Sequence, residues 1–142
     1  MIIDNVYVFT PDKAFVKGGI ILDGDKIRQV YEEKDVPQLS GDVLDGKGCY
    51  AIPGLIDLHF HGCKGDDFCD GDKAAIGRIA EYEASVGVTA IAPATMTLPV
   101  EELEQIHHTA AEYKKETKDC RKADFLGINM EGPFISPAKK GA

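Results

Sequence analysis

Short apolar runs separated by turn residues in the first part of the chain predict strands. Residues 6–9 (Val-Tyr-Val-Phe) are β-branched or aromatic, and a Thr-Pro-Asp sequence at 10–12 ends this run. Strand-like segments at 19–22 (Gly-Ile-Ile-Leu) and 27–30 (Ile-Arg-Gln-Val) flank Asp-Gly-Asp at 23–25. We expect a β-hairpin there, because Gly24 tolerates the positive φ angle of a tight turn.

The same pattern recurs before residue 53. Runs at 43–44 and 49–52 flank Asp-Gly-Lys-Gly at 45–48, which indicates a second turn of this kind. Residues 1–52 are therefore predicted to form a small antiparallel β unit.

Two later segments have the apolar spacing of amphipathic helices. In residues 72–86 four apolar residues recur on one helical face, and Gly87 is placed to end the helix. Thr97 and Pro99 open the second helix, whose first turn carries two glutamates that favour the helix dipole. The predicted buried positions are Ala75, Ile79, Tyr82 and Val86 in the first helix, and Leu103, Ile106, Ala110 and Tyr113 in the second.

Strand-like segments alternate with these helices. They span residues 55–60, 88–92 and 124–130. Strand–helix alternation predicts an α/β class with a parallel sheet and right-handed crossovers. Three strands are few for such a sheet, so we expect residues 53–142 to be the first portion of a larger domain.

Composition and charge restrict the class of partner. The net charge of -8 over 142 residues argues against nucleic acid and anionic membranes, which attract positive surfaces. No apolar run approaches the roughly 20 residues of a membrane span, and Met1–Asn5 lacks the basic start of a signal peptide. We therefore expect a cytoplasmic protein whose four cysteines are reduced thiols.

The strongest candidate for chemistry is the His-x-His pair at the end of the first strand-like segment. Residues i and i+2 of a strand point to the same side, so His59 and His61 can present two imidazoles to one divalent ion. The alternative without a function is that one histidine is packed in the core and the other is exposed to solvent. The preceding Pro-Gly turn and Asp57 within an apolar strand favour the metal hypothesis. Asp57 itself either orients a histidine or caps the loop.

A carboxylate follows the third strand-like segment. Glu131 lies at the carboxyl end of that strand, on the same edge as the histidines if the sheet is parallel. Carboxylates bind hard divalent ions, and Gly132-Pro133 turns the chain directly after it. An isolated glutamate here would more often be a solvated loop residue, but its coincidence with the histidines favours metal binding.

Other ionisable residues carry weaker signals. His107 and His108 are adjacent on a helix and cannot both face one site, so we expect them on the surface. Cys63 and Cys69 could join the His-x-His pair in a structural zinc site, although their spacing is unusual. We expect the remaining charged candidates to be solvated: Lys139 and Lys140, and the acidic loop of Asp66, Asp67, Asp70 and Asp72.

These motifs resemble a known enzyme family. The sequence Pro53-Gly54-x-Ile56-Asp57-x-His59-x-His61 resembles the first barrel strand of the amidohydrolase superfamily. Residues 129–136 (Asn-Met-Glu-Gly-Pro-Phe-Ile-Ser) through 139–142 (Lys-Lys-Gly-Ala) are similar to N-acetylglucosamine-6-phosphate deacetylases specifically, as are residues 86–89 and 93–95. The resemblance covers essentially the whole chain.

The resemblance implies a fold and a set of roles. Residues 1–52 would be the amino-terminal part of a small β-sandwich, and residues 53–142 the first strands and helices of a (β/α)8 TIM-type barrel. Glu131 would bind metal, and His59 and His61 would hold a second ion that some members have lost. Ala142 would contact the sugar through its backbone. The catalytic aspartate and further histidine ligands would lie beyond residue 142, so no catalytic residue is assigned within the chain.

The implied reaction is hydrolysis of the acetamide of N-acetylglucosamine 6-phosphate with one or two zinc or iron ions. The implied partner is this small phosphorylated amino sugar, whose phosphate Lys139 and Lys140 could attract. We expect the 142 residues alone to be inactive, to bind metal weakly if at all, and to self-associate through exposed apolar sheet edges. Two alternatives remain: an amidohydrolase acting on a cyclic amide, and a non-catalytic metal-binding module.

Overall fold

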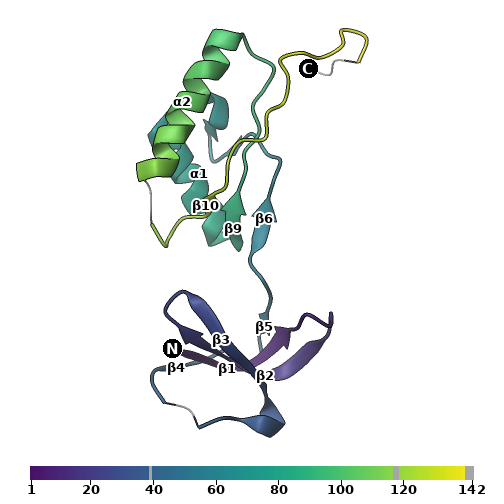
Figure 1. The fold of residues 1–142 in the computed structure, drawn as a ribbon, viewed down its shortest axis with the longest axis vertical. Helices are drawn as coiled ribbons and strands as arrows, with labels where there is room; N and C mark the ends of the chain where they lie inside the picture. The colour runs from purple at the N-terminus through teal and green to yellow at the C-terminus, as the bar shows by residue number, and fades with distance from the viewer. Residues whose placement is uncertain (39, 117–118, 140–142) are drawn as a thin grey trace. The chain divides into compact units, whose positions relative to one another are not determined.

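The computed structural model describes residues 1–38, 40–116 and 119–139. The chain divides into two units, Met1–Pro53 and Gly54–Ala142, each with its own main sheet (Figure 1). None of the helices in the described ranges combines the length and the apolar character that a bilayer crossing requires.

Three antiparallel strands form the body of the first unit. Strand β1 (Ile2–Phe9) pairs with β2 (Phe15–Asp23), and β2 pairs with β3 (Lys26–Glu32). Gly24 has a φ angle of 58°, which confirms the predicted hairpin turn. Val6 and Val8 of β1 and Ile20 of β2 form a buried core, and the partly buried Val16 and Leu22 of β2 pack against it.

The second predicted turn does not make a hairpin. Strands β4 (Val43–Asp45) and β5 (Tyr50–Ala51) both pair with β1 in parallel, so the prediction of a purely antiparallel unit was wrong. The turn between β4 and β5 lies beside an irregularity in β1 between Ile3 and Val6. There Gly46 N donates to the Asp4 carbonyl and Gly48 N donates to the Asn5 carbonyl, both at 2.8 Å. The chain therefore continues along β1 instead of reversing.

The second unit contains a three-stranded parallel sheet in the order β10-β9-β6. These strands are β6 (Leu55–Asp57), β9 (Val88–Ile91) and β10 (Asp124–Phe125). The parallel arrangement confirms the prediction, but β6 and β10 are much shorter than the predicted 55–60 and 124–130. Beyond their ends, the chain is held by separate backbone bonds such as Ala94 N to the Phe60 carbonyl at 2.7 Å.

Helices α1 (Lys73–Ser85) and α2 (Val100–Glu116) pack beside each other against this sheet (Figure 1). The stripe predicted for α2 is confirmed, since all four of its residues are buried. The stripe predicted for α1 was partly wrong, because Val86 caps the helix and is 53% exposed. The buried face of α1 consists of Ala75, Ile76, Gly77, Ile79, Ala80 and Glu83.

The acidic loop is not merely solvated. It contains the short strands β7 (Gly62–Cys63) and β8 (Asp66–Asp67) and the 3-10 helix Phe68–Asp70. Asp67 and Asp70 form a reciprocal capping box on the 3-10 helix, and Asp72 caps α1 by accepting hydrogen bonds from Ala74 N and Ala75 N. Asp66 makes two hydrogen bonds with the Arg78 guanidinium, at 2.6 and 2.9 Å. Asp67, Asp70 and Asp72 are structural because unpaired backbone N–H groups at helix starts need acceptors, and Asp66 is structural because it pairs with Arg78.

Apolar side chains remain exposed on and after β6 and β10. Leu55, Ile56 and Leu58 are 54–59% exposed, and Leu126 and Met130 are 43% and 57% exposed. Exposed apolar groups at an open sheet edge favour association with further chain. The expectation of self-association stays a prediction.

Glu83 provides a test of the packing between α1 and the sheet. Its burial, and then the charge of Asp57, raise the pKa of its carboxyl. The raised folded-state pKa makes protonation stabilising, fully so below the ordinary glutamate range, and this contribution disappears as the pH rises through the folded-state pKa. We predict that Glu83→Gln increases the free energy of unfolding by about 1 kcal/mol at pH 7.

Urea unfolding followed by circular dichroism at several pH values measures this difference, which should vanish at low pH. Glu81→Gln, at an exposed position of the same helix, serves as the control and should change little. A loss of stability in Glu83→Gln at pH 7 would refute the argument.

The capping role of Asp72 gives a second prediction. Asp72→Ala removes the acceptor for Ala74 N and Ala75 N, which lie 3.0 and 3.2 Å from its carboxylate oxygens. We expect a loss of about 1 kcal/mol in urea unfolding, most of which Asp72→Asn should restore. Equal stability of the alanine variant and the unmodified chain would show that the cap contributes nothing.

Candidate metal centre

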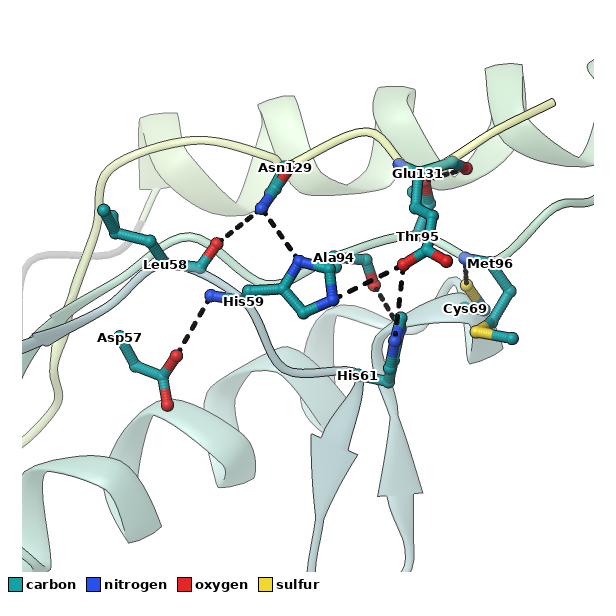
Figure 2. A network of polar contacts seen from close by, with 10 residues as sticks. All are labelled: Asp57, Leu58, His59, His61, Cys69, Ala94, Thr95, Met96, Asn129 and Glu131. Atoms are coloured by element: carbon teal, nitrogen blue, oxygen red, sulfur yellow. Dashed lines mark hydrogen bonds and ion pairs between the residues drawn. The ribbon is translucent and has the colours of Figure 1, made fainter. Parts of the chain in front are cut away.

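The carboxyl ends of the three parallel strands lie at one edge of the sheet and carry the candidate ligands. His59 and His61 follow β6, and Glu131 follows β10 (Figure 2). The chain after β9 lies between them, joined to the segment after β10 by a parallel bridge between Ala94 and Asn129. Parallel pairing thus brings together residues separated by about seventy positions in the sequence.

Two imidazoles and one carboxylate converge at this edge. The Glu131 Oε2 atom lies 3.4 Å from His59 Nε2 and 3.7 Å from His61 Nε2. One ligand atom from each residue lies within 4.8 Å of the others, as a site for one divalent ion requires. The three predicted ligands are therefore neighbours, and Figure 2 shows both rings directed toward the carboxylate.

The two histidines converge from a different backbone conformation than the predicted strand. We expected His59 and His61 within a strand, but both lie beyond the end of β6 at Asp57. Their rings are at 81° to each other instead of stacked in register. Asp57 accepts a hydrogen bond from the His59 backbone N at 3.0 Å, so of its two proposed roles the structure shows the loop cap.

The orientation of His61 suits metal binding. Its Nδ1 lies 3.2 Å from the Ala94 carbonyl oxygen. Because a carbonyl only accepts, Nδ1 donates in this contact, and in the neutral form of the ring Nε2 would present a lone pair toward Glu131. Two acceptors thus face each other at 3.7 Å, an arrangement that a cation between them would satisfy. The donor set and its geometry fit a divalent ion.

Glu131 is held by a buried threonine that sequence reasoning did not select. The Glu131 backbone N donates to Thr95 Oγ1 at 3.0 Å, and Thr95 Oγ1 donates to the Glu131 carbonyl at 3.2 Å. Thr95 is 0% exposed. Gly132 follows with a φ angle of 72°, and a Cβ there would lie 2.5 Å from Thr97 Oγ1. The turn after Glu131 therefore requires glycine.

Asn129 is a second residue that the sequence did not identify as part of the site. Its Nδ2 lies 2.7 Å from the Leu58 carbonyl and 3.2 Å from His59 Nδ1. The signal available in the sequence was its position two residues before Glu131, which places both at the same strand end.

The cysteines do not join this group. Among the described residues, the cluster of possible ligands consists of His59, His61 and Glu131. Burial raises the pKa of both the Cys63 and Cys69 thiols, which disfavours the thiolates that bind zinc. Cys69 Sγ instead accepts a hydrogen bond from Met96 N at 3.2 Å.

The other candidates lie elsewhere. Both His107 and His108 belong to α2: the first is partly buried and bonded to the Leu103 carbonyl at 2.6 Å, the second exposed and paired with Glu112 at 3.3 Å. Lys139 is exposed. Lys140 and Ala142 lie outside the described residues.

Comparisons with known proteins agree on one family of enzymes. The chain is 27% identical over 143 residues to the N-acetylglucosamine-6-phosphate deacetylase of Bacillus subtilis (strain 168), a match that covers 100% of the chain and 36% of that relative. It is 34% identical over 134 residues to the deacetylase of Bos taurus, covering 92% of the chain and 31% of that relative.

The structural comparison agrees. The crystal structure of N-acetylglucosamine-6-phosphate deacetylase from Pasteurella multocida matches with a TM-score of 0.85 and 29% identity, over 99% of this chain and 36% of that one. No protein-family model matches. The chain spans about a third of the length of these relatives.

The assignment of Glu131 as a metal ligand predicts that its substitution weakens zinc binding. Glu131→Gln should weaken zinc binding at least tenfold, because it replaces the carboxylate common to both imidazoles with a neutral amide. The apparent dissociation constant can be measured by titration followed through the histidine imidazole signals in NMR spectra.

Cys63→Ser and Cys69→Ser are the matched controls and should leave zinc affinity unchanged. A large loss of zinc affinity in the cysteine variants, with little loss in Glu131→Gln, would support the structural zinc site that includes the two cysteines.

Proposed function

The chain is a relative of the N-acetylglucosamine-6-phosphate deacetylases, and we propose that it contributes the metal centre of an enzyme with this activity. The enzyme would hydrolyse the acetamide of N-acetylglucosamine 6-phosphate to glucosamine 6-phosphate and acetate. The observation that carries the proposal is the convergence of His59, His61 and Glu131 at the carboxyl edge of a parallel sheet.

The site chemistry suits amide hydrolysis. A divalent ion bound there, zinc or iron, supplies Lewis acidity that polarises the amide carbonyl and lowers the pKa of water from about 15.7 toward 7. Glu131 and His61 would hold the ion with a carboxylate oxygen and an imidazole nitrogen. Their side chains are 46% and 34% exposed, so the site is open to a water-soluble substrate.

The protein groups around the ligands keep them in place. Thr95 fixes the backbone of Glu131 on both sides, and the Ala94 carbonyl holds the proton of His61 on Nδ1. Ordered partners of this kind reduce the reorganisation needed when an ion and a substrate bind. Ala142 remains a proposed backbone contact of the sugar.

The proposed complete fold is a (β/α)8 barrel beside a small β-sandwich. Strands β6, β9 and β10 would be its first three strands, with α1 and α2 on the outside. Further strands would cover the exposed apolar residues on and after β6 and β10, and would supply the remaining ligands and the catalytic aspartate. Since the relatives are about three times as long, we expect no substantial turnover from these 142 residues alone.

Two other functions make different predictions. An amidohydrolase specific for a cyclic amide would share the histidine pair but would leave N-acetylglucosamine 6-phosphate intact. A non-catalytic metal-binding module would bind zinc tightly within the 142 residues, and the raised thiol pKa values of Cys63 and Cys69 count against a thiolate version of it.

The test is acetate release from N-acetylglucosamine 6-phosphate by the product of the complete reading frame that encodes these residues. We predict chelator-sensitive release, and a loss of at least about 100-fold in kcat/KM for Glu131→Gln because a direct metal ligand is removed.

Glu101→Gln, at an exposed position of α2, is the control for loss of one carboxylate and should retain activity. Absence of release from a folded, metal-loaded protein would exclude this substrate and favour the cyclic-amide alternative.

A further inference from the structure

The two histidines of the metal centre differ in the partner of their Nδ1 atoms. His61 Nδ1 faces the Ala94 carbonyl oxygen at 3.2 Å, whereas His59 Nδ1 faces the Asn129 amide nitrogen at 3.2 Å (Figure 2). A carbonyl oxygen only accepts a hydrogen bond, and an amide NH2 only donates one. In the neutral forms of the two rings, these partners favour opposite tautomers.

The orientation of the Asn129 amide follows from its second contact. The group 2.7 Å from the Leu58 carbonyl oxygen must be a donor, so it is the NH2 and not Oδ1. Turning the amide over would bring two oxygens within this distance. The remaining N–H can then point at His59 Nδ1, which must accept.

We propose that Asn129 is a positioning residue that fixes the proton of His59 on Nε2. This inference rests on the metal centre of the proposed function. With that proton, His59 Nε2 donates toward Glu131 Oε2 at 3.4 Å, whereas His61 Nε2 presents a lone pair to the same oxygen at 3.7 Å. Glu131 and His61 hold the first ion, and His59 becomes a ligand only after the Asn129 amide turns away.

The arrangement differs from the usual support of a metal ligand. A histidine that binds metal through one nitrogen generally donates the other N–H to a carboxylate, a carbonyl or water. His61 follows this rule through Ala94, whereas His59 has a donor in that place. Asn129 is partly buried and tied to Leu58, so its amide is held in the orientation that blocks His59. Occupancy of the centre by one or two ions thus depends on this side chain.

The first test reads the tautomers directly in the 142-residue chain. With 15N-labelled histidine and a chelator present, long-range 1H–15N spectra should show the Nε2–H tautomer for His59 and the Nδ1–H tautomer for His61. His59→Gln and His61→Gln assign the signals. The same tautomer for both rings, or a proton on His59 Nδ1, would overturn the proposal.

The second test adds zinc and separates positioning from a structural role. In the unmodified chain, saturating zinc should shift the His61 Nε2 signal and leave His59 as an N–H donor. Asn129→Asp replaces the donor with an acceptor, so His59 Nε2 should shift as a ligand and zinc should bind about tenfold tighter. Asn129→Leu, a control of similar size, lacks both groups and should free the tautomer of His59 without this gain.

A merely structural Asn129 would weaken zinc binding in both variants and leave the His59 tautomer unchanged, and that result would reject the inference. Failure of the unmodified chain to bind any zinc would instead count against the proposed metal centre, while the metal-free spectra would still decide the role of Asn129.

Discussion

Parallel pairing of β6, β9 and β10 is the constraint on which the site depends. It places the carboxyl ends of three strands at one edge, so that His59, His61 and Glu131 meet although β6 and β10 are far apart in the sequence. Helices α1 and α2 maintain the pairing by burying their apolar faces against the sheet. The short strands leave the ligands on the segments beyond them, where separate backbone bonds fix their positions.

Electrostatic complementarity within the site follows from these positions. The carboxylate of Glu131 faces one imidazole lone pair and one imidazole N–H, because the Ala94 carbonyl and the Asn129 amide impose opposite tautomers on the two rings. A cation between the carboxylate and His61 Nε2 would satisfy both acceptors, whereas the proton on His59 Nε2 already bridges the other contact. The candidate metal centre is thus asymmetric before any ion binds.

The sequence predicted the parallel sheet, both helices and the meeting of His59, His61 and Glu131, because apolar spacing and the strand-end position of polar residues are local signals. It could not predict where β6 ends, since that depends on bonds from the segment after β9 such as Ala94 N to the Phe60 carbonyl. Thr95 and Asn129 were missed for a related reason. Short polar side chains have no diagnostic spacing, and their partners are 36 and 71 positions away.

The location of a bound ion tests the central claim most directly. Anomalous X-ray diffraction at the zinc edge, from zinc-soaked crystals of the 142-residue chain, would give this location. We predict a peak about 2.0–2.2 Å from a Glu131 carboxylate oxygen and His61 Nε2. A peak between Cys63 and Cys69, or zinc bound only at sites that exclude Glu131, would contradict the account.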